Sequence, residues 1–260
     1  MQNNPIGIFD SGIGGLSIWK EIITLLPNEN TIYLADSKNA PYGQKTKQEI
    51  IDLSVKNTDL LIKKGCKIIV VACNTATTNA IDFLRKNYTI PFIGIEPAIK
   101  PAALKTKTKK IGILATKGTL NSELFSNQAA EFSENIEIIE QIGEGLVPLI
   151  ESGKINSIAL DILLKKYLFN LIEKEIDYLV LGCSHYPFLI PQIKLIIGDK
   201  IKIIDSGEAV AKQVENILKQ NNLLKIKTNL GNHKLFSNLN EQIIEQFIQK
   251  ENCKINFLNF

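Results

Sequence analysis

Residues 67–75 read Lys-Ile-Ile-Val-Val-Ala-Cys-Asn-Thr, and this stretch decides the fold class. Its apolar residues form an unbroken run, as in a strand whose two faces are both covered by helices. Half-exposed antiparallel strands alternate apolar and polar residues instead. The stretch therefore predicts a central parallel strand over Lys67–Ala72, with Cys73 at its carboxyl end.

On both sides of this strand, short apolar runs alternate with longer stretches of helical period. This alternation indicates an α/β fold with a mostly parallel sheet. The predicted strands are Ile6–Phe9, Thr31–Ala35 and Ile90–Gly94, and the predicted helices are Gly14–Leu26, Lys47–Lys64 and Thr75–Asn87.

The pattern then begins again. The later strands are expected over Lys110–Ala115, Asp177–Gly182 and Ile201–Ile204, and the helices from about Thr119, over Ile155–Lys174, after Pro187 and over Ser206–Asn221. The tail from about His233 to Phe260 alternates strand-like and helical pieces, and we assign it to the first half.

The two halves also resemble each other in sequence. Ile6-Gly-Ile-Phe-Asp-Ser-Gly12 is similar to Ile111-Gly-Ile-Leu-Ala-Thr-Lys-Gly118, and Val70-Val-Ala-Cys-Asn-Thr75 to Val180-Leu-Gly-Cys-Ser-His185. Both similarities end at the carboxyl ends of strands, where open α/β sheets bind ligands. We therefore expect two similar lobes, one of residues 1–97 with 206–260 and one of residues 98–205.

Composition narrows the possible partners. The chain has 260 residues, with 30 Lys and Arg against 27 Asp and Glu, so its net charge of +3 argues against nucleic acid or an anionic membrane as partner. No apolar segment reaches the roughly 20 residues that cross a bilayer. The amino-terminus lacks the charged and apolar regions of a signal peptide. We expect a cytoplasmic protein with no membrane partner.

The four cysteines form no Cys-x-x-Cys pair, so the sequence supports neither a zinc ribbon nor a dithiol redox centre, and no metal is expected. In a reducing cytosol a structural disulfide is also unfavoured. Each cysteine is then either a small buried hydrophobe or a reactive thiol. They are Cys66, Cys73, Cys183 and Cys253.

Cys73 directly precedes a predicted helix, for which Asn74 or Thr75 is the expected N-cap. The N–H groups and macrodipole at a helix start favour a thiolate. Cys183 ends a second apolar strand, two residues from His185, and an imidazole can poise a thiol or orient a substrate carboxylate. A buried core cysteine is the alternative at each position, but it explains poorly why the two match.

Other polar residues follow the predicted strands. Asp10-Ser11-Gly12 with Gly14-Gly15 is a glycine-rich turn, which suits either anion binding at a helix start or a tight strand-to-helix connection. It is not a dinucleotide fingerprint. The Asp10 carboxylate could pair with a substrate ammonium or help Cys73 exchange its proton. Pro41-Tyr42-Gly43 suits a surface turn, and Glu151 a solvated charge at a helix end.

Together these segments closely resemble the glutamate racemase family, in the family's order and over roughly residues 6–210. As a set they are far more specific than any one of them. The matching strings are Gly7-Ile-Phe-Asp-Ser-Gly-Ile-Gly-Gly-Leu16, Ala35-Asp-Ser37, Pro41-Tyr-Gly43, Val71-Ala-Cys-Asn-Thr-Ala76, Leu146-Val-Pro-Leu-Ile-Glu151, Leu181-Gly-Cys-Ser-His-Tyr-Pro187 and Ile204-Asp-Ser-Gly207.

The resemblance implies an active site between the lobes and interconversion of L- and D-glutamate without pyridoxal phosphate, another cofactor or metal. It implies that Cys73 and Cys183 are the acid–base pair and that Asp10, Glu151 and His185 support them. It also implies a homodimer and a supply of D-glutamate for peptidoglycan. The implied substrate contacts are Asp10, Ser11, Tyr42, Gly43, Asn74, Thr75, Ser184 and His185.

The resemblance is incomplete in places, and other functions compete with it. The family usually has Thr where this chain has Ser184, which keeps the hydroxyl donor. Residues from Ala98 onward and the Asn-rich tail fit the family pattern poorly. The alternatives are an aspartate racemase or another two-cysteine isomerase, a non-catalytic amino-acid-binding protein, and a thiol or metal hydrolase that uses Cys183 and His185.

Overall fold

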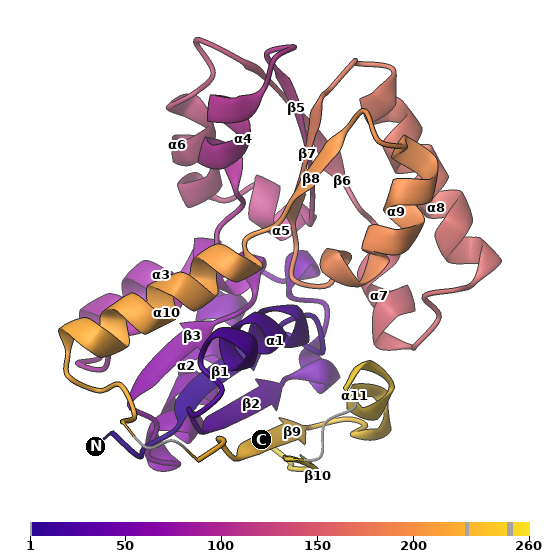
Figure 1. The fold of residues 1–260 in the computed structure, drawn as a ribbon. Helices are drawn as coiled ribbons and strands as arrows, with labels where there is room; N and C mark the ends of the chain where they lie inside the picture. The colour runs from indigo at the N-terminus through magenta and orange to yellow at the C-terminus, as the bar shows by residue number, and fades with distance from the viewer. Residues whose placement is uncertain (1, 227–228, 249–251) are drawn as a thin grey trace.

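The fold, in a computed structural model that describes residues 2–226, 229–248 and 252–260, contains two parallel sheets (Figure 1). The first has the order β10-β9-β2-β1-β3-β4 and the second β6-β5-β7-β8. The first sheet comprises β1 (Ile6–Asp10), β2 (Thr31–Ala35), β3 (Ile68–Val71), β4 (Phe92–Gly94), β9 (His233–Ser237) and β10 (Cys253–Phe257). The second comprises β5 (Lys110–Ala115), β6 (Glu137–Ile142), β7 (Tyr178–Gly182) and β8 (Lys202–Ile204).

The predicted internal similarity is present in the topology. The order β2-β1-β3-β4 in one sheet repeats as β6-β5-β7-β8 in the other. Cys73 lies just beyond β3 and Cys183 just beyond β7, so the two thiols occupy equivalent positions. In both sheets the chain order reverses between the first and third strands of the unit, and such switch points are where open α/β sheets bind ligands.

Helices cover both faces of the first sheet. Ile8, Ile68 and Val70 pack in one buried cluster with residues of α1 and α10, while Phe9, Ile69 and Val71 pack in another with residues of α2 and α3. This two-sided burial explains the continuous apolar run. The helices are α1 (Leu16–Leu25), α2 (Lys47–Lys63), α3 (Asn74–Asn87) and α10 (Gly207–Gln220).

The second sheet is flanked in the same way by helices of residues 99–197. They are α4 (Ile99–Lys105), α5 (Lys117–Leu120), α6 (Glu123–Ala130), α7 (Leu146–Glu151), α8 (Ile158–Ile172) and α9 (Ile190–Ile197). A short α11 (Gln242–Phe247) lies in the tail, and short 3-10 turns cover Ser37–Asn39, Tyr42–Gln44 and Tyr186–Leu189.

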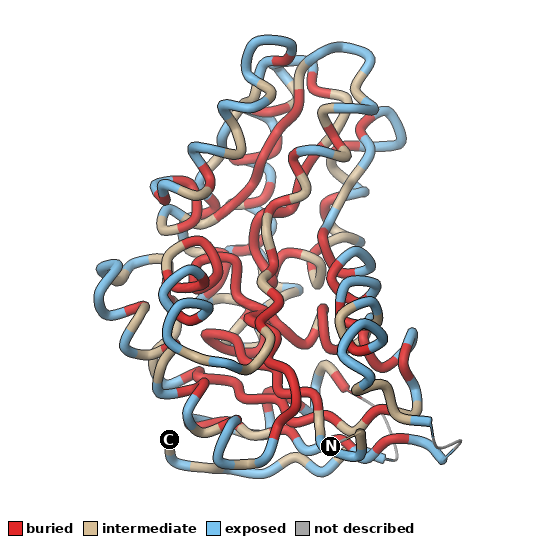
Figure 2. Tube along the Cα trace, turned by 90° about the vertical axis from the view of Figure 1, so that its left-hand side faces the viewer, coloured by how far each residue is buried: buried red, intermediate tan, exposed pale blue. Residues whose placement is uncertain are grey.

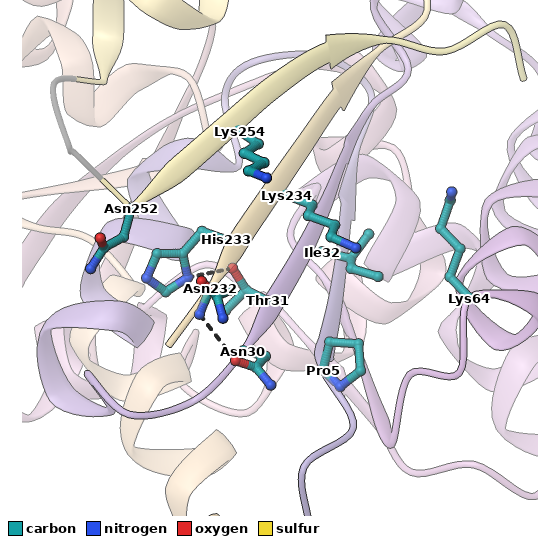
Figure 3. A pocket seen from close by; sticks show the side chains of 10 residues that line it. All are labelled: Pro5, Asn30, Thr31, Ile32, Lys64, Asn232, His233, Lys234, Asn252 and Lys254. Atoms are coloured by element: carbon teal, nitrogen blue, oxygen red, sulfur yellow. Dashed lines mark hydrogen bonds between the residues drawn. The ribbon is translucent and has the colours of Figure 1, made fainter. Parts of the chain in front are cut away.

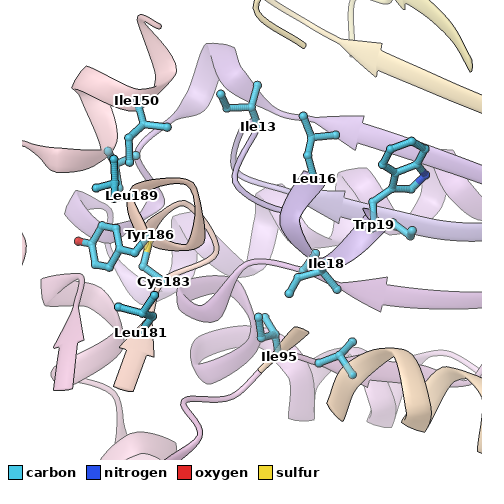
Figure 4. Close-up of a cluster of buried hydrophobic side chains, with 14 of the residues drawn as sticks. Ile13, Leu16, Ile18, Trp19, Ile95, Ile150, Leu181, Cys183, Tyr186 and Leu189 are labelled. Atoms are coloured by element: carbon cyan, nitrogen blue, oxygen red, sulfur yellow. The ribbon is translucent and has the colours of Figure 1, made fainter. Parts of the chain in front are cut away.

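One apolar cluster continues from the first lobe into the second. Ile13 and Leu16, at the start of α1, belong to the same buried cluster as Ile150, Tyr186 and Leu189 of the second lobe (Figure 4). Buried chain runs through both lobes and through the region where they meet (Figure 2). Each such side chain contributes about 1.5–3 kcal/mol when it leaves water. This shared core holds the lobes close together.

Two elements were absent from the sequence-based expectation. β6 is a half-exposed edge strand with two glutamates, so it lacks the apolar run that marks the buried strands. The short α4 carries Pro101 in its first turn and follows Pro97. The predicted helix Ile155–Lys174 is shorter as α8, and the predicted strand Ile90–Gly94 begins at Phe92.

The tail does combine strands with a helix, and β9 and β10 extend the first sheet, although residues 249–251 lie outside the described residues. We propose that the lobes are residues 1–97 with 206–260 and residues 98–205. The boundaries follow β4 and β8, which are edge strands of the first and second sheet, and α10 packs on α1 of the first lobe. Within the described residues no helix is both long and apolar enough to cross a membrane.

A buried ion pair fastens the amino-terminal edge of the first sheet. Lys67 Nζ lies 2.6 Å from Glu29 Oε2, and both side chains are almost fully buried. The ammonium also donates to the carbonyls of Gln2 and Leu223, and Glu29 Oε1 accepts from the Lys225 N–H at 2.7 Å. The pair therefore connects the amino-terminus, the start of β3 and the segment after α10.

Replacing one partner of this pair leaves the other charge buried and alone. Glu29→Leu is expected to lower the free energy of unfolding by about 3–5 kcal/mol. The double variant Glu29→Leu/Lys67→Met should recover part of that loss, since it removes both charges. Asp161→Asn is the control, because it breaks the exposed Asp161–Lys165 pair, worth about 0.5 kcal/mol or less. Urea unfolding measures all three, and equal effects of Glu29→Leu and Asp161→Asn would contradict the assignment.

Candidate active site

Cys73 forms the N-cap of α3. Its Sγ accepts the Ala76 N–H at 3.4 Å, and its backbone is extended, with φ −103° and ψ 120°. The expected caps, Asn74 and Thr75, are instead the first residues of the helix. That expectation was wrong because the strand ends at Val71, two residues before the thiol, so the sulfur itself reaches the open N–H groups. Cys73 also donates to Ser11 Oγ at 3.6 Å.

Cys183 lies beside His185, and Glu151 connects this histidine to the first lobe. His185 Nδ1 is 3.8 Å from Cys183 Sγ, and His185 Nε2 is 2.5 Å from Glu151 Oε1. The same Glu151 oxygen accepts the Ile13 N–H at 2.7 Å, and Oε2 accepts from Ser37 Oγ at 3.0 Å. Glu151 therefore binds the glycine-rich turn and the loop after β2 while it holds the imidazole next to the thiol. It is not the solvated helix-end charge that its surroundings in the sequence suggested.

The second lobe approaches the glycine-rich turn most closely at Gly12 and Gly14, which have no side chains. A Cβ on Gly12 would lie 2.0 Å from Glu151 Oε1, and one on Gly14 would lie 2.2 Å from His185 Nδ1. Asp10 Oδ2 accepts the N–H groups of Gly12 and Gly15, at 3.3 and 3.0 Å. The turn's donors therefore serve carboxylates of this chain, which removes the support for an external anion site there.

Asp10 connects the glycine-rich turn of the first lobe with Ser184 of the second. Its carboxylate is fully buried, and Oδ1 accepts from Ser184 Oγ at 3.2 Å. Neither Asp10 nor Glu151 lines the cavity that contains the thiols. In this closed arrangement Asp10 does not reach the cavity, whereas its carboxylate is within hydrogen-bond reach of the Cys73 side chain.

The two thiols line one cavity between the lobes. It holds only about 10 Å³, room for roughly one water molecule, so a bound amino acid requires the cavity to widen. Every suggested substrate-contact residue except Asp10 lines this cavity. The lining residues are Ser11, Pro41, Tyr42, Gly43, Cys73, Asn74, Thr75, Thr116, Val147, Cys183, Ser184 and His185.

Among the residues that line the cavity, Asn74 has a side-chain amide whose hydrogen-bonding groups are unsatisfied. Its side chain is buried, and neither its Oδ1 nor its Nδ2 has a hydrogen-bond partner among the described residues. A buried amide without partners costs free energy, which a ligand with both donor and acceptor groups recovers.

Thr116 and Thr119 were not among the site residues predicted from the sequence. Thr116 Oγ1 lies 2.8 Å from Thr75 Oγ1, and Thr119 Oγ1 lies 3.2 Å from it, so the three hydroxyls form a cluster across the lobes. A signal was present, because Thr116 follows β5 where Ser11 follows β1 in the matching segment.

The Tyr42 loop is held by Asp36. Tyr42 Oη donates to Asp36 Oδ2 at 2.5 Å, and Asn39 and Asn238 donate to Asp36 Oδ1. Asn238 also donates to the carbonyl of Phe260, at the end of the chain. The tail therefore supports a wall of the cavity, although its sequence suggested no such role.

Burial sets the charge states of the site. It raises the pKa of the Cys73 thiol well above its ordinary value, and the nearby Asp10 charge adds to the rise. Burial likewise raises the pKa of Asp10. At His185 burial acts in the opposite direction, but hydrogen bonds to Cys183 and Glu151, together with their negative charges, raise its pKa well above the usual value. The imidazole is therefore cationic and donates toward both partners at neutral pH.

Residues 6–214 match the family model of the Asp/Glu/Hydantoin racemases. The chain belongs to this family. It is 43% identical to a glutamate racemase of Clostridium perfringens over 251 residues, which cover 96% of each chain. Its place within the family is with the glutamate racemases.

Solved structures agree with this placement. A glutamate racemase of Francisella tularensis in complex with D-glutamate matches with a TM-score of 0.84 and 30% identity, over 98% of both chains. An aspartate racemase of Picrophilus torridus matches with a TM-score of 0.55 and 18% identity, over 86% of this chain and all of that one, which shows a shared fold alone.

The Glu151 contact makes a direct prediction for His185. Glu151→Gln removes a negative charge from the imidazole, so the pKa of His185 should fall toward its ordinary value. The stability that the raised pKa gives is present at low pH and is lost as pH rises through the folded-state pKa, so in Glu151→Gln this loss moves to lower pH. Titration by nuclear magnetic resonance measures it, and His233, the only other histidine, is the internal control. An unchanged midpoint for His185 would contradict the electrostatic role of Glu151.

Proposed function

We propose that this protein interconverts L- and D-glutamate by a two-base mechanism in which Cys73 and Cys183 act on opposite faces of the substrate. The observation that carries the proposal is the position of the thiols, which end equivalent strands of two repeated lobes and line one cavity. Racemisation removes the Cα proton from one face and returns one to the other, so it requires a thiolate and a thiol together.

In the proposed step from L-glutamate, the Cys183 thiolate takes the Cα proton and the Cys73 thiol donates its proton to the opposite face. The protonated His185, held by Glu151, stabilises the thiolate beside it. The raised pKa of Cys73 keeps it a thiol at neutral pH, as a donor requires. From D-glutamate the roles are exchanged. Asp10, whose pKa is also raised, accepts the proton of Cys73, and the protonated His185 returns a proton to Cys183. The Cys73 thiolate then takes the Cα proton and the Cys183 thiol donates its proton to the opposite face. The choice of face rests on the family resemblance.

The difficult intermediate is a carbanion whose charge spreads into the α-carboxylate. Fixed donors in a closed, dry site stabilise such charge better than water does. The Asn74 amide and the hydroxyls of Ser11, Thr75 and Ser184 are the donors that line the cavity. No cofactor is part of this proposal, because the residues themselves supply both proton carriers and the stabilising groups.

Substrate entry requires access to a nearly closed cavity. A second cavity of about 260 Å³ shares Pro41, Gly43, Thr116 and Val147 with the first, and Lys117 stands in its wall. We propose that glutamate enters here, where the ammonium of Lys117 attracts its carboxylates, and that movement of the lobes widens the inner cavity.

The proposal predicts the behaviour of single cysteine variants. In D2O, the wild-type protein should incorporate deuterium at Cα of either glutamate enantiomer while it racemises them. Cys73→Ala and Cys183→Ala should each abolish racemisation, about 10³-fold or more, because each removes a proton carrier. Cys66→Ala, a buried thiol outside the cavity, is the matched control and should remain active. A racemising Cys73→Ala or Cys183→Ala variant would refute the two-base assignment.

The same assay separates the alternatives. Faster turnover of D- and L-aspartate than of glutamate would make the protein an aspartate racemase. Binding without deuterium exchange would favour a non-catalytic amino-acid-binding protein, although binding alone needs neither thiol. Chelator-sensitive hydrolysis would favour a hydrolase that uses Cys183 and His185. We further propose that the D-glutamate serves peptidoglycan synthesis in the cytoplasm, which depletion of the protein would test through loss of wall precursor.

We also propose that the protein is a homodimer. Ile158, Ile162 and Phe169 are exposed along one side of α8, and Leu195 of the neighbouring α9 is 87% exposed. An apolar stripe of this kind favours self-association. Sedimentation should give the mass of two chains, and Phe169→Glu should shift it toward one. A wild-type monomer at micromolar concentration would contradict the proposal.

A further inference from the structure

A large cavity in the described part of the chain lies away from the thiols, at the amino-terminal ends of β1, β2, β9 and β10 (Figure 3). It holds about 670 Å³, within the usual range for small-molecule sites. The proposed catalytic residues follow the opposite, carboxyl ends of the strands. A ligand here would therefore not compete with the substrate.

Three lysines line this cavity. Lys234 of β9 and Lys254 of β10 are direct register partners on adjacent parallel strands, so they project from the same face of the sheet. Lys64 follows α2, and its Nζ lies 4.5 Å above the ring of Phe236, two residues along β9 from Lys234. The three ammonium groups therefore gather over one face of the same two strands.

The described lining of the cavity is positively charged. No Asp or Glu is among its described lining residues, and the nearby carboxylate of Glu29 is already paired with Lys67. Like charges opposite each other on neighbouring strands destabilise a sheet. The repulsion between Lys234 and Lys254 therefore lowers the stability of the fold, and a bound anion would reverse this effect.

The remaining walls suit a small organic anion. Ile32, the register partner of Lys234 on β2, and Pro5 provide apolar surface beside the lysines. Asn30, Asn232 and Asn252 bring side-chain amides to the rim. Lysine binds phosphate as a point charge, and two or three lysines match a group with several negative charges. The surface is hollowed, so a compact ligand reaches all three charges while a flat membrane does not.

We propose that this cavity is a second ligand site, which binds a small phosphorylated metabolite through Lys64, Lys234 and Lys254. The phosphoryl oxygens lie among the ammonium groups, and the organic part rests on Ile32 and Pro5. Binding stabilises the fold because it cancels the repulsion between Lys234 and Lys254.

Inorganic pyrophosphate is the probe, in thermal unfolding and calorimetric titration at low ionic strength. It should raise the melting temperature of the wild type by about 2–4 °C at saturation. Lys234→Gln/Lys254→Gln should weaken binding by about tenfold or more and remove the shift. Without the probe, this variant should melt at or above the wild-type temperature, because the like-charge pair is gone.

Lys200→Gln/Lys202→Gln is the matched control, since it removes the same charge from exposed positions of the other lobe. It should bind pyrophosphate as the wild type does. Equal binding by both double variants, or no binding by the wild type, would overturn the proposal. Co-sedimentation with phosphatidic acid vesicles is the remaining arm, and binding to vesicles without binding to free pyrophosphate would also overturn it.

Discussion

The carboxylate of Glu151 reaches from the second lobe into the first and joins segments that are far apart in the chain. It accepts the Ile13 N–H and the Ser37 hydroxyl, and it holds the imidazole of His185. This approach is possible only because Gly12 and Gly14 have no side chains where Glu151 and His185 lie. Glu151 thus acts together with the shared apolar core in joining the lobes, and together with Cys183 in raising the pKa of His185.

Repetition of one topological unit places the two thiols. Each lobe contains the same order of four parallel strands, and each has its cysteine directly after the third strand of the unit. Because both cysteines follow the carboxyl ends of strands where the lobes meet, the two equivalent positions line one cavity. A reaction that needs proton carriers on two faces of one carbon fits this arrangement, which a single lobe could not provide.

The wider structure balances stability against function at both ends of the first sheet. At the carboxyl end, Asp10 is buried and the Asn74 amide has no hydrogen-bond partner among the described residues, which are costs to stability at the proposed catalytic site. At the amino-terminal end, Lys67 and Glu29 pair with each other and fasten the edge of the sheet. Lys234 and Lys254 are register partners in a cavity whose described lining contains no Asp or Glu. The paired charges of Lys67 and Glu29 suit a structural role, whereas the like charges of Lys234 and Lys254 suit the proposed binding of an anion.

The sequence by itself determined the parallel strands, the repeat and the positions of Cys73 and Cys183 at strand ends, because apolar periodicity is a local property of the chain. It did not reveal β6, whose exposed edge position removes the apolar signal. Only the tertiary structure decided that Cys73 caps its own helix, that Asp10 and Glu151 stand behind the cavity wall, and that Thr116 joins it. These depend on contacts between distant residues, such as Ile13 with Glu151, 138 positions apart, which no local pattern encodes.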